Sequence, residues 1–256
     1  AMSIYLDRSL KKAARHCCIV SNSREILENF RPYTESAHFI RTTTLRQQDF
    51  YERTDTCQHA PYNVLFTGRF DFAKGLRELL EACAQLIKQG QPLRLHLAGW
   101  EDTAGQPVSA WLEERAKALG ITEFVVNHGK LKHGEGLNTL YRSVDIYVMP
   151  SYHEGFPRAI WEAMANSVPV IATSVGSIPH NLSDRQDALL MEPKSVESIV
   201  ENIQELINDA ALRQRLIANG RVLAKEATLE IQSEKLLGII DVYLKNTAPV
   251  HKIPVH

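Results

Sequence analysis

The stretch Tyr147–Asn166 reads YVMPSYHEGFPRAIWEAMAN and predicts a strand end, a turn and the first half of a helix. Its first residues, together with Ile146, form a short apolar run that Pro150 ends. Glycine and proline mark the turn, and the strong helix formers of Ala159–Ala165 follow it. Such a junction aims free backbone N–H groups and the positive end of a helix dipole at the space above it. It is typical of an anion-binding site.

Two carboxylates, Glu154 and Glu162, lie within this stretch. On a helix their offset would correspond to roughly 12 Å of rise and about 80° of rotation, so they would meet different parts of one extended ligand. A surface acid and a helix-capping acid are the structural alternative for the pair. Glu162, however, lies among Trp161, Ala163 and Met164, where a carboxylate needs a donor such as a ribose hydroxyl or an arginine.

The composition is that of an ordinary globular protein. The chain has 256 residues, 44% of them hydrophobic and 23% charged, which allows one large or two small domains. A net charge of −1 gives no electrostatic reason to expect nucleic acid as a partner. The four cysteines show no CxxC spacing, so neither a zinc site nor a disulfide framework is expected, and a cytoplasmic compartment is predicted.

Strands and helices alternate along most of the chain. The predicted strands are 64–67, 93–98, 122–127, 145–149, 168–172 and 188–191, and the helices between and after them include 76–87, 108–119, 137–144, 196–203, 212–223 and 231–243. This alternation predicts an α/β fold, a doubly wound, parallel Rossmann-like sheet of about six strands with helices on both faces. Ligands of such sheets bind beyond the carboxyl ends of the strands, where we expect Gly68, Gly99, Gly129 and Pro150.

The N-terminal part is different. Residues 1–41 read as a helix, a short strand and a capped helix, residues 42–60 as a connector, 61–246 as the main domain, and 247–256 as a tail. The basic side chains of Lys11, Lys12 and Arg15 are interpreted as a solvated helix face, with a site peripheral to the inner face of a membrane as the alternative. No apolar run has the length needed to span a bilayer.

The loop Gly68–Gly75 follows the first strand of the main domain and reads GRFDFAKG. It is neither a Walker loop nor a dinucleotide fingerprint. It offers two cations, Arg69 with a bidentate fork and Lys74 as a mobile charge, which together would neutralise a diphosphate. A solvated loop with scattered cations is the structural alternative. Because the sequence has no Asp-x-Asp motif, no metal site is predicted, and the cations and the helix terminus could replace a divalent ion.

Together these segments resemble the retaining glycosyltransferases of group 1, which have the two-domain GT-B fold and use nucleotide-activated sugars. The resemblance runs from about Asn63 to Tyr243 and covers the C-terminal, donor-binding half of that fold. It rests on the order and spacing of FTGR with Lys74–Gly75, LAG at 97–99, the strand before Gly129, MPS at 149–151, the paired glutamates and PVIAT at 169–173.

The resemblance implies a role for each matching residue. Arg69 and Lys74 correspond to the cations that bind the diphosphate, Glu154 to the acid at the donor sugar, and Glu162 to the acid at the ribose. The remaining predicted binding residues are Gly68, Gly99, His128, Gly129, Lys130, Ser151, Gly155, Phe156, Pro157 and Arg158, with the base received at 128–130. Retention of configuration through front-face departure of the diphosphate is implied, with no cofactor besides the nucleotide sugar.

Relatives carry a whole N-terminal domain that binds the acceptor, and only residues 1–41 resemble its end. A truncated chain is therefore expected, one that binds nucleotide sugar but transfers it poorly without its N-terminal partner. The implied acceptor is a glycan or lipid-linked glycan of polysaccharide or lipopolysaccharide biosynthesis. The family's connector turn is replaced here by Arg41–Thr44, a difference that we do not expect to touch the cations or the glutamates.

Two other functions compete with this interpretation. A nucleotide-sugar 2-epimerase of the same fold would need further acids and a histidine near the sugar, for which only His153 and His180 are candidates. A non-catalytic scaffold module is the second alternative. Calorimetry with nucleoside diphosphates separates them, because a scaffold predicts no heat.

Overall fold

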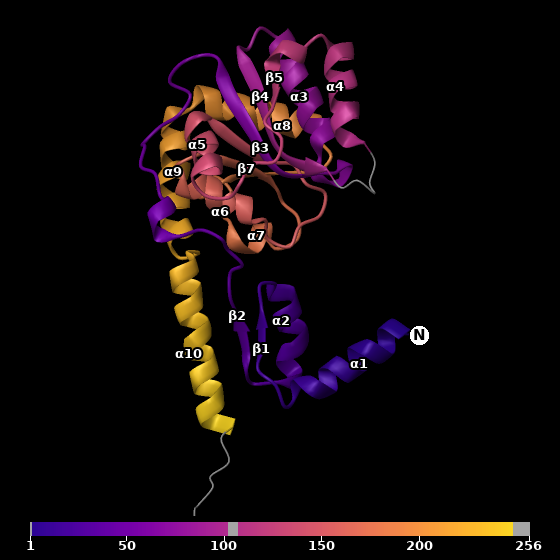
Figure 1. Ribbon diagram of the computed structural model, residues 1–256, viewed down its shortest axis with the longest axis vertical. Coiled ribbons are helices and arrows are strands. Elements are labelled where there is room, and N and C mark those ends of the chain that lie inside the picture. Colours follow the sequence, from indigo (N-terminus) through magenta and orange to yellow (C-terminus); the bar gives the residue numbers. More distant parts are fainter. Residues whose placement is uncertain (1, 102–106, 248–256) are drawn as a thin grey trace, which may run out of the picture. The chain divides into compact units, whose positions relative to one another are not determined.

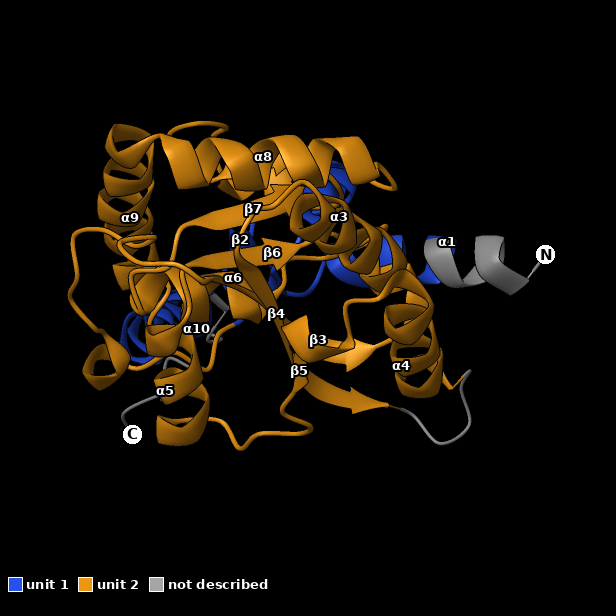
Figure 2. Ribbon diagram, turned by 90° about the horizontal axis from the view of Figure 1, so that it is seen from above, with its two compact units in different colours: residues 1–42, 229–256 blue, residues 43–228 orange. Residues whose placement is uncertain are grey.

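A computed structural model describes residues 2–101 and 107–247, with side chains for 8–101 and 107–246. The chain divides into two compact units, Thr43–Thr228 and a smaller unit of Ala1–Thr42 with Leu229–His256 (Figure 2). Of the tail predicted at 247–256, Thr247 is the last residue of a helix and residues 248–256 lie outside the described residues. Within the described part of the chain, no helix combines the length and the apolar character that crossing a bilayer requires.

The larger unit contains a six-stranded sheet in which every neighbouring pair is parallel, as the alternation predicted. Its spatial order is β5-β4-β3-β6-β7-β8, the order of dinucleotide-binding folds, so the chain reverses direction across the sheet between β3 and β6. Figure 1 labels β5, β4, β3 and β7 of this sheet. The strands are β3 (Tyr62–Phe70), β4 (Leu93–Glu101), β5 (Val125–Asn127), β6 (Ile146–Met149), β7 (Val170–Thr173) and β8 (Leu189–Met191).

Helices cover both faces of this sheet, which confirms the doubly wound architecture. One set of helices packs together on one face: α3 (Leu76–Lys88), α4 (Val108–Leu119) and α8 (Val196–Asn208). The other set consists of α5 (Glu135–Ser143), α6 (Arg158–Ala165) and α9 (Ala210–Lys225), and a short helix α7 (Ile178–Asn181) follows β7. Gly120, in the left-handed region, ends α4 as the sequence indicated.

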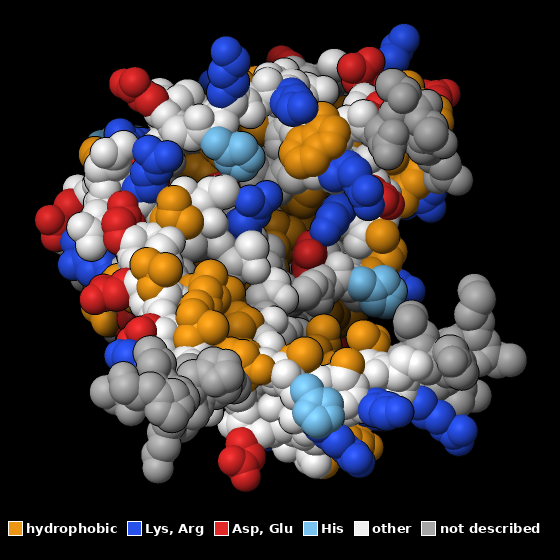
Figure 3. Space-filling model, turned by 60° about the horizontal axis from the view of Figure 1, so that its bottom comes forward, with side chains coloured by type: hydrophobic (Ala, Val, Ile, Leu, Met, Phe, Trp, Pro, Cys, Tyr) orange, Lys and Arg blue, Asp and Glu red, His pale blue; other side chains and the backbone are white. Residues whose placement is uncertain are grey.

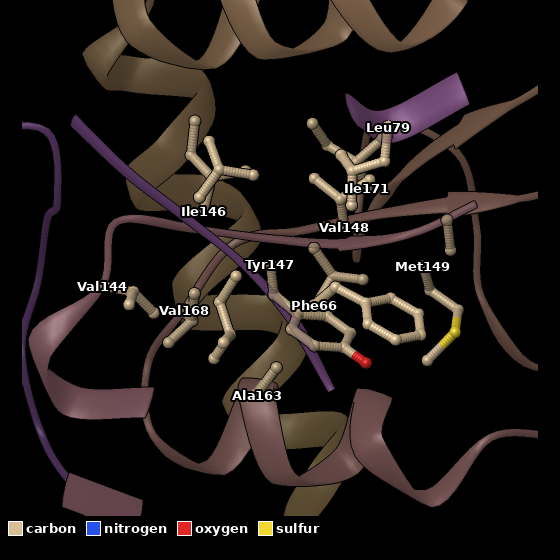
Figure 4. Close-up of a cluster of buried hydrophobic side chains, with 14 of the residues drawn as sticks. Phe66, Leu79, Val144, Ile146, Tyr147, Val148, Met149, Ala163, Val168 and Ile171 are labelled. Carbon is tan, nitrogen blue, oxygen red and sulfur yellow. The ribbon is translucent and has the colours of Figure 1, made fainter. Parts of the chain in front are cut away.

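The core lies on both sides of β6, whose four residues are all buried. Because side chains alternate along a strand, Val148 points toward Leu79 of α3 while Tyr147 points toward Ala163 of α6 (Figure 4). Two apolar layers therefore hold β6 at the centre of the sheet. This fixes the loop that follows Met149.

Two strands extend beyond the predicted ends. We expected β3 and β4 to stop at Gly68 and Gly99, and this was wrong, because pairing continues to Phe70 and Glu101. Phe70 is buried and so prolongs the packed face of β3. Gly68 and Gly99 are paired with each other, and a Cβ on Gly99 would overlap the Gly68 carbonyl oxygen. Gly99 is thus needed for the close approach of two backbones.

The predicted connector 42–60 lies almost entirely within the larger unit, where Leu45 and Cys57 are buried in the core. Asp55 is paired there with Arg213 of α9 at 2.8 Å. The ion pair lies inside the fold, since the Arg213 side chain is only 5% exposed. These contacts anchor a segment in which the sequence shows little periodicity.

The smaller unit contains α1 (Met2–Ala14), β1 (Ile19–Ser21), α2 (Arg24–Phe30), β2 (Ala37–Phe39) and α10 (Leu229–Thr247). Ser23 caps α2 by accepting a hydrogen bond from the Ile26 amide, as predicted. The strand β2, which pairs in parallel with β1, was missed because its sequence AHF lacks the apolar run that indicated β1. Helix α10, predicted as part of the main domain, groups with residues 1–42.

Candidate functional site

A cleft of about 960 Å³ opens where β3 and β6 end, at the position where open α/β sheets bind ligands. Strand ends, the loops after them and the first turns of α5 and α6 form its wall. The lining residues are Thr67, Gly68, Arg69, Lys74, Ala98, Gly99, Trp100, Lys130, Leu131, Lys132, His133, Leu137, Met149, Glu154, Pro157, Arg158, Ala159 and Glu162.

Direct contacts hold together the two loops that flank the cleft. The Tyr152 amide donates a hydrogen bond to the Ala73 carbonyl oxygen at 2.8 Å. Gly75 lies against Pro150, with a positive φ of 70° and no room for a Cβ beside the Pro150 carbonyl oxygen. The loop after β3 therefore positions the loop after β6.

The side chains of Lys74 and Glu154 form an ion pair across these loops, with 2.5 Å between Nζ and Oε1. The pair is largely enclosed, since the Lys74 side chain is 24% exposed and that of Glu154 is 11% exposed. Lys74 directly precedes Gly75, and Glu154 lies in the turn before α6. The helical offset assumed for Glu154 and Glu162 was wrong, because α6 begins only at Arg158.

Arg69 lies on β3 with its guanidinium 3.0 Å from the Asp71 carboxylate. Asp71 also accepts a hydrogen bond from the Ala73 amide at 2.9 Å, which begins the short 3-10 turn before α3. About half of the Arg69 side chain, 49%, is exposed. Asp71 thus holds Arg69 at the edge of the cleft while leaving much of its fork accessible.

Glu162 is buried on the first turns of α6, 9% exposed, with a donor at each carboxylate oxygen. Thr44 Oγ1 donates to Oε1 at 3.1 Å, and Tyr141 OH donates to Oε2 at 3.2 Å. His133 Nδ1 lies 3.5 Å from Oε1. The expectation that the Arg41–Thr44 segment would not touch the glutamates was wrong.

A hydroxyl network continues behind Glu162 into the core. Tyr141 OH lies 2.7 Å from Thr67 Oγ1, and that oxygen is 3.3 Å from Tyr147 OH. Burial, with a further contribution from the charge of Glu162, raises the pKa of Tyr141 well above its usual value. Tyr141 therefore stays protonated and donates to the carboxylate, which fixes Glu162 in one orientation.

Most of the residues predicted from the sequence gather in this cleft. Those in its lining are Gly68, Arg69, Lys74, Gly99, Lys130, Glu154, Pro157, Arg158 and Glu162, whereas His128, Gly129, Ser151, Gly155 and Phe156 are outside it. Ser151 is fully buried, and the Phe156 ring stacks on Trp161 with 4.3 Å between ring centroids. The exposed His153 and His180 also lie outside the lining.

His128 forms a pair with His96 of β4, with 2.9 Å between the ring nitrogens Nε2 and Nδ1. The other nitrogen of His96 lies 3.0 Å from Asn63 Oδ1. Burial and the neighbouring His128 lower the pKa of His96 to about 4. This pair therefore remains neutral near pH 7 and fastens the segment after β5 to the sheet.

Sequence reasoning missed Thr44, Trp100, Lys132, Tyr141 and His133. Trp100 directly follows Gly99, and His133 lies three residues after Lys130. This proximity to predicted site residues is the sequence feature that could have indicated them. The cleft lining contains five Lys and Arg residues and two glutamates. In Figure 3, basic side chains gather around a hollow in which acidic and hydrophobic side chains are visible. This charge balance suits an anionic ligand that also carries hydroxyl groups.

Comparison with known proteins gives consistent matches. A family model described as Glycosyl transferases group 1 matches residues 49–223. A capsular polysaccharide biosynthesis glycosyltransferase from Staphylococcus aureus is 26% identical over 183 residues, which are 71% of this chain and 46% of that protein. The chain spans between 34% and 46% of the length of the first curated relatives that it matches.

Solved structures share the fold. The C-terminal domain of a group 1 glycosyl transferase from Francisella tularensis is 27% identical, with a TM-score of 0.64, and the match covers 72% of this chain and 99% of that domain. HepE from Anabaena, solved with UDP, is 18% identical, with a TM-score of 0.76 over 88% of this chain and 64% of that protein.

Proposed function

The chain belongs to the group 1 glycosyl transferases, and we propose that it is the half of such an enzyme that binds the nucleotide-sugar donor. The observation that carries the proposal is the cleft at the ends of β3 and β6, whose lining contains the cations Lys74 and Arg69 together with two enclosed glutamates, Glu154 and Glu162. Such a set matches the parts of a nucleotide sugar, with charge in the middle and hydroxyl groups at both ends.

The donor lies along the cleft with its diphosphate at Lys74 and Arg69. The N-terminus of α6, which begins at Arg158, adds backbone N–H groups and a positive dipole end. Glu162 accepts hydrogen bonds from the ribose, and Glu154 accepts them from the sugar. Because Lys74 and Glu154 form an ion pair, a diphosphate that binds Lys74 releases Glu154 to accept hydrogen bonds from the sugar hydroxyls.

Transfer proceeds with retention of configuration and without a metal ion. The bond between the anomeric carbon and the diphosphate oxygen breaks, and the acceptor oxygen forms its bond on the same face of the sugar. The acceptor proton passes to the departing diphosphate, whose negative charge Lys74 and Arg69 stabilise. Support for metal independence comes from these cations and from the helix terminus, which supply the positive charge that a divalent ion would supply.

The acceptor is a glycan or lipid-linked glycan, and a separate N-terminal domain binds it. Support for a C-terminal position comes from the Francisella tularensis domain, and support for a polysaccharide acceptor from the Staphylococcus aureus relative. This chain alone then holds the donor half of an active site and transfers sugar slowly or not at all.

Calorimetry with UDP, GDP and ADP tests the proposal. At least one of the three releases heat with a one-to-one stoichiometry, and a radiolabelled sugar from the matching donor reaches acceptors only in trace amounts. Absence of heat with all three would favour a scaffold module. Sustained transfer by this chain alone would refute the assignment to a donor-binding half.

A further inference from the structure

Trp100 presents a large, half-exposed aromatic ring in the cleft lining, with 46% of the residue exposed. The other two tryptophans are used in packing, since Trp161 is buried against Phe156 and Trp111 lies edge-on to Phe72. An exposed ring beside a cleft of this size is typical of a surface that stacks on a planar or cyclic ligand.

The register of the sheet places Trp100 beside a cation of the diphosphate site. Trp100 of β4 is the direct partner of Arg69 on β3, and paired residues of neighbouring parallel strands extend to the same face. A ligand group stacked on Trp100 is therefore adjacent to the diphosphate. That group is either the nucleoside or the sugar.

The loop after β5 indicates which end of the donor stacks on Trp100. Lys130 Nζ lies 5.6 Å from the centre of the Trp100 ring, and three residues later His133 Nδ1 lies 3.5 Å from Glu162. Three residues span at most about 10 Å. One short loop thus reaches both the Trp100 ring, through Lys130, and Glu162, the acid proposed to hold the ribose, through His133.

We propose that Trp100 is the stacking surface for the nucleobase of the donor and that the base replaces Lys130, whose ammonium lies over this ring. The inference rests on the proposed function, because it assumes that the diphosphate and ribose lie as described there. Stacking of a base on tryptophan is stronger than an exposed cation–π contact, so the base displaces the Lys130 ammonium from the ring. The displaced ammonium remains close enough to attract the diphosphate.

The test compares the chain with its Trp100→Ala, Trp100→Phe and Lys130→Ala variants, using UDP, ADP and inorganic pyrophosphate in calorimetry. In Trp100→Ala the stacking ring is lost, so the affinity for each nucleotide falls about five- to hundredfold, while the affinity for pyrophosphate changes by less than about twofold. Trp100→Phe recovers most of the affinity, and Lys130→Ala costs less than Trp100→Ala.

A second measurement does not depend on the alanine variant. UDP changes the tryptophan fluorescence of the wild-type chain, pyrophosphate does not, and Trp100→Phe abolishes the response. Unchanged UDP affinity in Trp100→Ala, or equal losses for UDP and pyrophosphate, would refute the stacking role and leave the proposed function intact. A wild-type chain that binds neither pyrophosphate nor any of UDP, GDP and ADP would overturn both.

Discussion

Gly75→Ala is expected to separate the two loops that form the cleft. Gly75 has a φ of 70°, and an added Cβ would overlap the Pro150 carbonyl oxygen. A non-glycine residue in this region costs about 1–2 kcal/mol, and relief of the overlap about 1–3 kcal/mol more. Since about 1 kcal/mol lowers the Tm of a unit of this size by roughly 2–4 °C, Tm should fall by about 4–20 °C.

Gly120→Ala provides the matched control. Gly120 has a φ of 73°, and nothing lies within 4 Å of an added Cβ, so only the conformational cost applies. Differential scanning calorimetry should therefore show a larger decrease in Tm for Gly75→Ala. UDP should also bind the Gly75→Ala variant more weakly than the wild-type chain, because Lys74 directly precedes Gly75. Equal decreases in Tm with unchanged UDP affinity would show that the loops do not constrain each other.

Three further changes test the surroundings of the cleft. Tyr141→Phe removes one donor to Glu162, so calorimetry should show UDP binding weakened about two- to tenfold. The pKa of His96 is lowered to about 4 in the fold, so unfolding takes up protons below about pH 6.5 and the urea midpoint falls as pH decreases toward 4. In His96→Gln the urea midpoint should depend less on pH. Midpoints that fall in parallel in the variant and the wild-type chain would refute the role of His96. Arg213→Met removes the cation from the enclosed Asp55 carboxylate, which keeps its hydrogen bonds from Thr56 and Gln58, and should lower the free energy of unfolding by about 3 kcal/mol in urea titrations.

Two control variants make these results specific. Tyr147→Phe removes a hydroxyl that contacts Thr67 but not Glu162, so it should change UDP affinity less than Tyr141→Phe does. Arg185→Ala breaks an exposed ion pair with Glu205 and should cost less than about 1 kcal/mol. A loss with Tyr147→Phe equal to that of Tyr141→Phe would contradict the donor role of Tyr141.

The fold was predictable because strand–helix alternation is a local pattern with a known consequence. Apolar runs bounded by glycine or proline located the strands of the sheet, and parallel connection then placed their ends on one edge. What the sequence could not supply was pairing at strand ends, which depends on the neighbouring strand. For this reason β3 and β4 continue through Gly68 and Gly99, where a single-strand pattern indicates a stop.

The candidate site was predictable where its residues follow a strand or open a helix. Lys74 and Glu154 were found in this way, and the structure places them together. The partners of Glu162 were not, because Thr44 lies 118 residues away and Tyr141 belongs to another helix. Trp100 was missed because a single aromatic residue after a strand has no pattern that separates a binding surface from ordinary packing.

The central claim is that Lys74 binds the diphosphate of a nucleotide, and calorimetry of Lys74→Ala with UDP and with uridine tests it most directly. Hydrogen bonds to charged groups are worth about 1.5–3 kcal/mol, so UDP should bind roughly ten- to hundredfold more weakly. Uridine should bind as it does to the wild-type chain, and Lys88→Ala, an exposed lysine outside the cleft lining, should change neither affinity. Equal weakening of UDP and uridine, or no effect on UDP, would contradict the account.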